Sequence, residues 1–398
     1  MRTDTNISTA LHIDKLEEVD LQWLLLDFFH GAFYDDSEAG VVFYPERNRA
    51  AVKLVYSNDY RVRAIAGPTL SNTTLAELQS RLEAEILAPP VRRIGREIFL
   101  SEKRVEGYFR HADLLQILPA PQDVPSADLK LPGMYPRYPF VLEFSFNASS
   151  NQILSDLRKY RVRCELEIVL NALLDGLLHC TTPVGGRYRW VLLPPDPQLP
   201  KCTFAQEGYV CSGFPSEAAQ FSDCSSLLKM PEFEPISYYE LSWTAAMSFG
   251  LPTDIAIQLG RFCNLSGEER KIWLTACHWL RHSSVALWDS RSAAFVALVT
   301  AVEALMPRKD RGDRKKFEAF IDRLAPGRGL QQDRSRFYRI RSELAHGAEL
   351  RGEDRDWLQV SITPEMSEQF REFQAMRRVA RLVAVNWLAG TNPASRNV

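Results

Sequence analysis

The chain has 398 residues, of which 45% are apolar and 25% are charged, and its formal net charge is −2. This balance is ordinary for a soluble globular protein, and a chain of this length usually folds as two or three domains. No window approaches eighteen uninterrupted apolar residues, and the first twenty residues contain early acids without an apolar core. We therefore expect neither a transmembrane helix nor a secretory signal peptide, and we expect a cytoplasmic protein.

The cysteines agree with a cytoplasmic location. There are seven, their spacing is irregular, and no Cys-x-x-Cys pair occurs. Five of them lie between Cys164 and Cys224, with His179 beside Cys180, but zinc sites usually show close pairs of ligands. We therefore predict reduced, buried thiols, with no metal and no other cofactor.

Charge is distributed unevenly along the chain. Residues 1–250 contain 24 Lys and Arg against 32 Asp and Glu, a net of −8, whereas residues 251–398 contain 24 against 18, a net of +6. Between Arg308 and Arg341, twelve basic residues stand against five acidic ones. This asymmetry favours a polyanionic partner for the C-terminal part, although a solvated helical surface would also account for it.

Residues 1–150 show the patterns of a mixed α/β domain. A capping box at 74–77 predicts a helix that runs to about residue 87. In the last predicted strand, Phe140, Leu142 and Phe144 fall on one face and Glu143 falls on the other. Six prolines between 119 and 139 predict an ordered loop or spacer. Short alternating apolar runs predict strands at 41–44, 51–56, 60–65, 96–100 and 140–146.

Residues 151–250 are expected to pack with the N-terminal domain. A broad apolar stripe predicts one long helix over about 150–180, and a strand is predicted at 187–193. An irregular region containing prolines and cysteines follows the strand.

Residues 251–398 are predicted to form a helical bundle. Ser266 and Glu269 form a second capping box, and Pro364 occupies the favoured first position of the last helix. Four substantial helices and one short insert fit a compact bundle, so the expected fold class is α+β. The predicted helices cover 266–282, 290–306, 314–324, 333–346 and 363–388.

The helix predicted at 333–346 ends with the string Tyr338-x-x-Arg341-Ser342-x-x-x-His346-Gly347. Arginine is a permanent, forked cation suited to phosphate, and histidine exchanges protons near neutral pH. An i, i+5 pair diverges on an ideal helix, but near a helix end both tips can turn toward one cleft. The string is equally a good helix terminus, because histidine favours the negative end of the helix dipole and glycine supplies a left-handed conformation. Spacing alone does not decide between these interpretations, because such matches arise readily by chance.

Residues 265–390 resemble the HEPN superfamily, and in particular its Apea-like branch. The resemblance rests on the string at 338–347 and on the apolar run at 295–305, which closes with Glu303-x-Leu305. It implies a C-terminal, all-α HEPN-like helical bundle that acts as a homodimer and cleaves RNA without a metal. Ser342 stands where much of the superfamily has Asn, Asp or His, but serine can still donate or accept one hydrogen bond.

The resemblance also implies roles for single residues. His346 would move the proton of a ribose 2′-hydroxyl, whose attack on the adjacent phosphorus leaves a 2′,3′-cyclic phosphate and a 5′-hydroxyl. Arg341 would bind the scissile phosphate, and Ser342 would orient the histidine or the phosphate. Glu303 is expected to pair with an arginine such as Arg341, and Tyr338 is expected to stack on a base or to support the arginine. The expected RNA-contact residues are Lys315, Lys316, Arg334, Arg336 and Arg339.

The leading hypothesis is therefore a metal-independent endoribonuclease of prokaryotic antiviral defence, or a regulated toxin. Its N-terminal region would sense an unknown trigger or restrain the nuclease, and its partners would be RNA and a second copy of the chain, with no membrane. Two alternatives stay open: a non-catalytic RNA- or nucleotide-binding module, and an assembly protein that uses the bundle only to dimerise.

Overall fold

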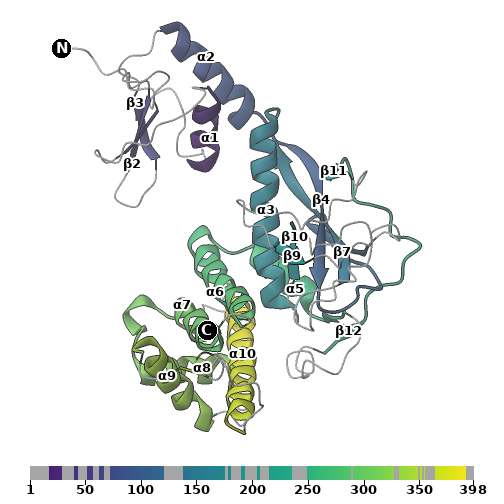
Figure 1. Cartoon of the computed structure of the whole chain (residues 1–398). Coiled ribbons are helices and arrows are strands. Elements are labelled where there is room, and N and C mark those ends of the chain that lie inside the picture. The colour runs from purple at the N-terminus through teal and green to yellow at the C-terminus, as the bar shows by residue number, and fades with distance from the viewer. Residues whose placement is uncertain are drawn as a thin grey trace, which may run out of the picture. The chain divides into compact units, whose positions relative to one another are not determined.

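The structure is a computed structural model that describes residues 18–28, 40–43, 52–56, 62–66, 72–120, 138–174, 178–180, 190–192, 204–206, 215–234, 249–287, 290–326, 331–347, 350–351, 354 and 364–390. The fold class is α+β, as predicted: strands occupy the N-terminal part and helices fill the C-terminal part (Figure 1). The chain divides into two compact units, one made of residues 1–93 and 145–162 and the other of residues 94–144 and 163–398. These divisions differ from the boundaries expected at 150 and 250: two strands and one helix each continue from one unit into the other.

The first unit contains a three-stranded antiparallel sheet in the order β1-β2-β3, which confirms the first three predicted strands. Helix α2 begins two residues before Thr74, so Thr74 lies in the first turn and not at the cap that the capping box predicted. Helix α1 was not predicted; its Asp20 accepts hydrogen bonds from Arg158 at 2.7 Å and from Arg161 at 2.9 Å on α3 (Gln152–Leu173). The elements are α1 (Glu18–Phe28), β1 (Gly40–Phe43), β2 (Val52–Tyr56), β3 (Val62–Ala66), α2 (Asn72–Leu82) and its π-helical extension η3 (Glu83–Leu87).

The second unit is built around a six-stranded sheet in the order β11-β4-β7-β6-β5, with β8 paired to β4. Both faces of β7 are covered at its centre, since Val141 and Glu143 are as fully buried as Phe140 and Phe144. The alternation at 140–146 therefore gave the two faces correctly but did not show that the second is buried. The strands are β4 (Val91–Ser101), β5 (Phe109–His111), β6 (Leu115–Pro119), β7 (Tyr138–Ala148), β8 (Leu178–Cys180) and β11 (Glu217–Ala218).

Helix α3 (Gln152–Leu173) ends earlier than the predicted residue 180, and 178–180 form strand β8. The side chain of Asn171 explains the difference. Its amide donates to the carbonyl of Leu178 at 2.9 Å and its oxygen accepts from the Leu178 N–H at 2.9 Å, so it satisfies the backbone where the chain leaves the helix. Two smaller sheets pair β9 (Trp190–Leu192) with β10 (Phe204–Gln206) and β12 (Glu232–Phe233) with β13 (Leu251–Pro252).

The C-terminal helices form a bundle in which α7 is buried on almost every side, and α6, α8, α9 and α10 pack against it (Figure 1). Small and branched apolar side chains along α7 permit this close approach. The five predicted helices and the Ser266–Glu269 capping box are confirmed, whereas α5 was missed. No helix in the described part of the chain is both long and apolar enough to cross a bilayer. The helices are α5 (Ile255–Cys263), α6 (Gly267–Ala286), α7 (Arg291–Leu305), the 3-10 turn η4 (Arg308–Asp310), α8 (Arg314–Leu324), α9 (Gln331–Ala345) and α10 (Pro364–Gly390).

Candidate functional site

The candidate site lies at the C-terminal end of α9, where the helix closes as the sequence predicted. Gly347 has a left-handed backbone with φ of 68°, and its N–H donates to the carbonyl of Leu344 at 3.1 Å. The His346 N–H donates to the carbonyl of the half-buried Ser342 at 3.0 Å. His346 is exposed just past the last helical residue. The helix terminus thus uses the backbone of His346 and leaves its imidazole at the surface.

Arg341 is held by the carboxylate that the sequence suggested. Its Nη2 donates to Oε2 of Glu303 on α7 at 3.1 Å; the glutamate side chain is 9% exposed and the arginine side chain 28% exposed. Within the described residues, Nε of Arg341 and Oε1 of Glu303 are buried and make no hydrogen bond. A single bond therefore fixes the guanidinium and leaves part of its donor capacity unused.

Tyr338 lies one helical turn before Arg341 and ties α9 to the turn before α8. Its hydroxyl donates to the carbonyl of Gly312 at 2.6 Å, and its ring packs against Phe317 with 5.4 Å between centroids. The guanidinium carbon of Arg341 lies 6.0 Å from the centre of the Tyr338 ring. Burial and then the nearby Glu303 carboxylate raise the pKa of Tyr338, which keeps the hydroxyl protonated as a donor. Tyr338 was expected either to stack on a base or to support Arg341, and these contacts are the ones expected of a supporting residue.

Removing this hydroxyl should loosen the turn without disturbing the bundle. We expect Tyr338→Phe to reduce the free energy of unfolding by about 1 kcal/mol, because one hydrogen bond to a carbonyl is lost and the ring is kept. Amide hydrogen exchange at 311–313 should accelerate more than exchange in α7. Tyr138→Phe is the matched control, since the Tyr138 hydroxyl makes no hydrogen bond within the described chain. Equal effects of the two substitutions would show that the hydrogen bond from Tyr338 to Gly312 does not hold the turn in place.

The five expected RNA-contact residues do not share one surface. Lys315 and Lys316 are exposed at the start of α8, and Arg339 is exposed on α9. Arg336 is half-buried and forms ion pairs with Glu368 and Glu372 on α10. Arg334 is only 2% exposed, pairs with Asp322 and donates to the carbonyl of Ala325 at 3.2 Å. Its assignment as an RNA contact was therefore wrong, because its charge is used inside the bundle.

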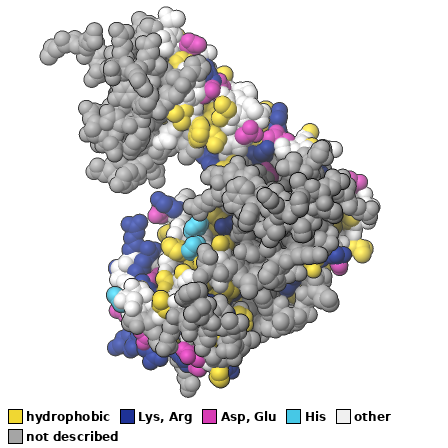
Figure 2. Space-filling view, viewed as in Figure 1, with side chains coloured by type: hydrophobic (Ala, Val, Ile, Leu, Met, Phe, Trp, Pro, Cys, Tyr) yellow, Lys and Arg dark blue, Asp and Glu magenta, His cyan; other side chains and the backbone are white. Residues whose placement is uncertain are grey.

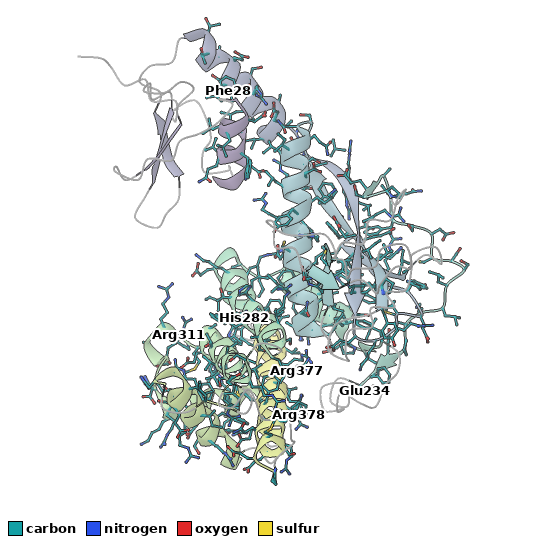
Figure 3. The ribbon with its side chains drawn as sticks, viewed as in Figure 1. Phe28, Glu234, His282, Arg311, Arg377 and Arg378 are labelled. Atoms are coloured by element: carbon teal, nitrogen blue, oxygen red, sulfur yellow. The ribbon has the colours of Figure 1, made fainter. Side chains whose placement is uncertain are left out.

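A basic segment at residues 308–316 contains four exposed cations in addition to Lys315 and Lys316. Figure 2 shows Lys and Arg side chains gathered on the edge of the bundle where Figure 3 labels Arg311. Arg311 donates to the carbonyls of Ala304 at 2.7 Å and Met306 at 3.2 Å, so it caps the C-terminal end of α7. The basic side chains of this segment, all exposed, are Arg308, Lys309, Arg311, Arg314, Lys315 and Lys316.

Comparison of the chain with protein-family models, curated proteins and solved structures finds no match. The likeness to the HEPN superfamily therefore rests on the sequence strings at 295–305 and 338–347. The described residues contain no group of three or more His, Cys, Asp or Glu placed to hold a metal ion, and the described cysteines are free thiols.

Proposed function

We propose that this chain is a metal-independent endoribonuclease whose catalytic residues are Arg341 and His346. The observation that carries the proposal is the end of α9, where a partly exposed guanidinium fixed by Glu303 precedes an exposed imidazole by five residues. A forked cation that binds phosphate and an imidazole that can exchange a proton are the two parts that this metal-independent attack by a 2′-hydroxyl uses.

Arg341 supplies the electrostatic part of this chemistry. Its charge is permanent, and Glu303 fixes its position through one hydrogen bond of 3.1 Å. The donors that remain can follow negative charge as it accumulates on the phosphate oxygens, where a fixed donor contributes most. Glu303 and Tyr338 act through Arg341 and are positioning residues.

His346 supplies the proton transfer. It takes the proton of the 2′-hydroxyl, the oxygen forms its bond to phosphorus, and the bond to the 5′-oxygen breaks as that oxygen takes a proton from a second, protonated imidazole. One chain provides a single Arg/His set, so we assign the second imidazole to the partner's His346 in a two-fold dimer. The Ser342 hydroxyl can donate or accept one hydrogen bond, and in this proposal it orients the histidine or the phosphate.

The basic segment at 308–316 fits the flanking phosphates of the substrate. Lys315 and its exposed basic neighbours lie on the same bundle edge as Gly312, which the Tyr338 hydroxyl ties to α9. Contacts to phosphates give affinity without reading sequence. In this proposal the enzyme acts in the cytoplasm in antiviral defence or as a toxin, and the N-terminal region senses the signal that releases it.

The test is cleavage of a labelled RNA by the full-length protein in excess EDTA, beside DNA of the same sequence. We expect RNA to be cut to products with 2′,3′-cyclic phosphate and 5′-hydroxyl ends, and DNA to stay intact because it lacks the attacking hydroxyl. His346→Ala, purified in parallel, excludes a contaminating nuclease. Loss of cleavage in EDTA, or cleavage of DNA, would show that the mechanism is wrong. Salt-sensitive RNA binding without cleavage would favour a binding module.

A further inference from the structure

Helix α6 carries two histidines that the proposed ribonuclease does not use. His278 and His282 are one helical turn apart and both exposed. Their rings are nearly parallel, at 5°, with 6.5 Å between centroids. Figure 3 labels His282 on α6, and Figure 2 shows histidine side chains at the surface of the bundle. The side chains at i and i+4 thus point from the same face of the helix into solvent.

The helix that carries the two histidines is packed into the bundle. Trp273 and Leu280 of α6 are buried in the bundle, and the Trp273 Nε1–H donates to the carbonyl of Ala384 on α10 at 3.0 Å. Trp279 meets both imidazoles edge-on, at 6.3 Å from His278 and 5.7 Å from His282. The two imidazoles therefore share one aromatic neighbour and lie side by side on the same face of α6.

The chemistry of the pair fits a metal ion better than an anion. Imidazole is a preferred ligand of Zn²⁺, Ni²⁺ and Cu²⁺. Two histidines at i and i+4 on one helix face are a known arrangement for binding a single metal ion, with metal–nitrogen bonds of about 2.0–2.1 Å. Arg281 is the nearest cation on the helix, and it forms an ion pair with Glu167 on α3, with 2.6 Å between Nη2 and Oε1. This ion pair offsets the charge that would otherwise repel a metal ion.

We propose that His278 and His282 bind one divalent transition-metal ion at the surface of α6. Two imidazoles are the protein ligands, and water completes the coordination, because no third His, Cys, Asp or Glu joins them in the described chain. Such a site is open and exchangeable, unlike the closed four-ligand sites that hold structural zinc. It lies on α6, whereas Arg341 is on α9 and His346 follows it, and the proposed cleavage uses no metal.

The experiment is a titration of tag-free, full-length protein with Cu²⁺, followed by electron paramagnetic resonance and by calorimetry. We expect one ion per chain in a site with two nitrogen ligands. His278→Ala and His282→Ala should each remove one nitrogen from the spectrum and weaken binding on the order of tenfold or more. Both side chains are exposed, so the variants should keep the circular dichroism of the wild type; His278→Gln and His282→Gln repeat the test with less change in volume.

His346→Ala is the matched control, since it removes another exposed histidine of the bundle and should leave the Cu²⁺ stoichiometry and spectrum unchanged. The proposal is overturned by binding that does not saturate, or by binding that survives both α6 substitutions. It would also be overturned by a spectrum that loses a nitrogen in His346→Ala. None of these results depends on RNA cleavage, so the metal site and the ribonuclease stand or fall separately.

Discussion

Replacing Arg341 with alanine should lower kcat for RNA cleavage on the order of 10²–10³-fold, the loss typical when one preorganised donor to a developing anion is removed. The reason lies in how the residue is held. Glu303 is almost completely buried on α7 and fixes the guanidinium through one hydrogen bond, so the charge is in place before substrate arrives. Rates under single-turnover conditions with excess enzyme measure this step apart from product release.

Two variants decide whether the loss is specific to the guanidinium fork. Arg339→Ala removes an exposed arginine of the same helix that was expected to contact RNA and lies 3.6 Å from Glu343. With enzyme in saturating excess, a lost phosphate contact weakens binding but should change the cleavage rate by less than about threefold. Arg341→Lys keeps the charge but not the fork, and should recover only part of the activity. If Arg339→Ala were as damaging as Arg341→Ala, the effect would be a loss of general basic charge, and Arg341 would not be catalytic.

Much of the bundle could be predicted because its signals are local. Ser266 and Glu269 form the capping box that the sequence shows, Ser290 caps α7, and Gly347 ends α9 in the left-handed conformation. Where local signals competed with contacts between distant segments, prediction failed. The apolar stripe of α3 continues past its real end, but residues 178–180 pair with β4, and Asn171 bonds the backbone of Leu178 where the chain leaves the helix.

The site shows the same limit. The strings at 295–305 and 338–347 suggested that Glu303 pairs with an arginine such as Arg341, and the two residues do form an ion pair. The sequence of the helix did not distinguish its exposed cations from its buried ones. Arg334 and Arg339 look alike in sequence, yet Arg334 is buried beside α8 and Arg339 is exposed. The roles of Arg311 and Gly312 depend on where α7, α8 and α9 meet, which no short sequence window contains.

Glu143 gives the largest expected effect on stability. It is completely buried on β7, and it accepts hydrogen bonds from Arg96 Nε at 2.9 Å, from the Ser222 N–H at 2.8 Å and from Gln116 Nε2 at 3.3 Å. We expect Glu143→Ala to reduce the free energy of unfolding by about 3 kcal/mol, because a network of polar donors loses its common acceptor. Chemical denaturation of the full chain measures the loss. Asp113→Ala, at an exposed ion pair with Arg110, should cost less than about 0.5 kcal/mol.

Charge and packing can be separated at this position by removing both charges together. If the cost of Glu143→Ala comes from the donors left without an acceptor, then Glu143→Met combined with Arg96→Met should be more stable than Glu143→Ala alone, since apolar pairs often replace buried ion pairs without loss. The carboxylate also joins β7 to Ser222, so the segment at 215–230 should exchange its amides faster in both variants. A double variant as unstable as the sum of its single changes would mean that the pair acts through shape, and the electrostatic account of this buried face of the sheet would be wrong.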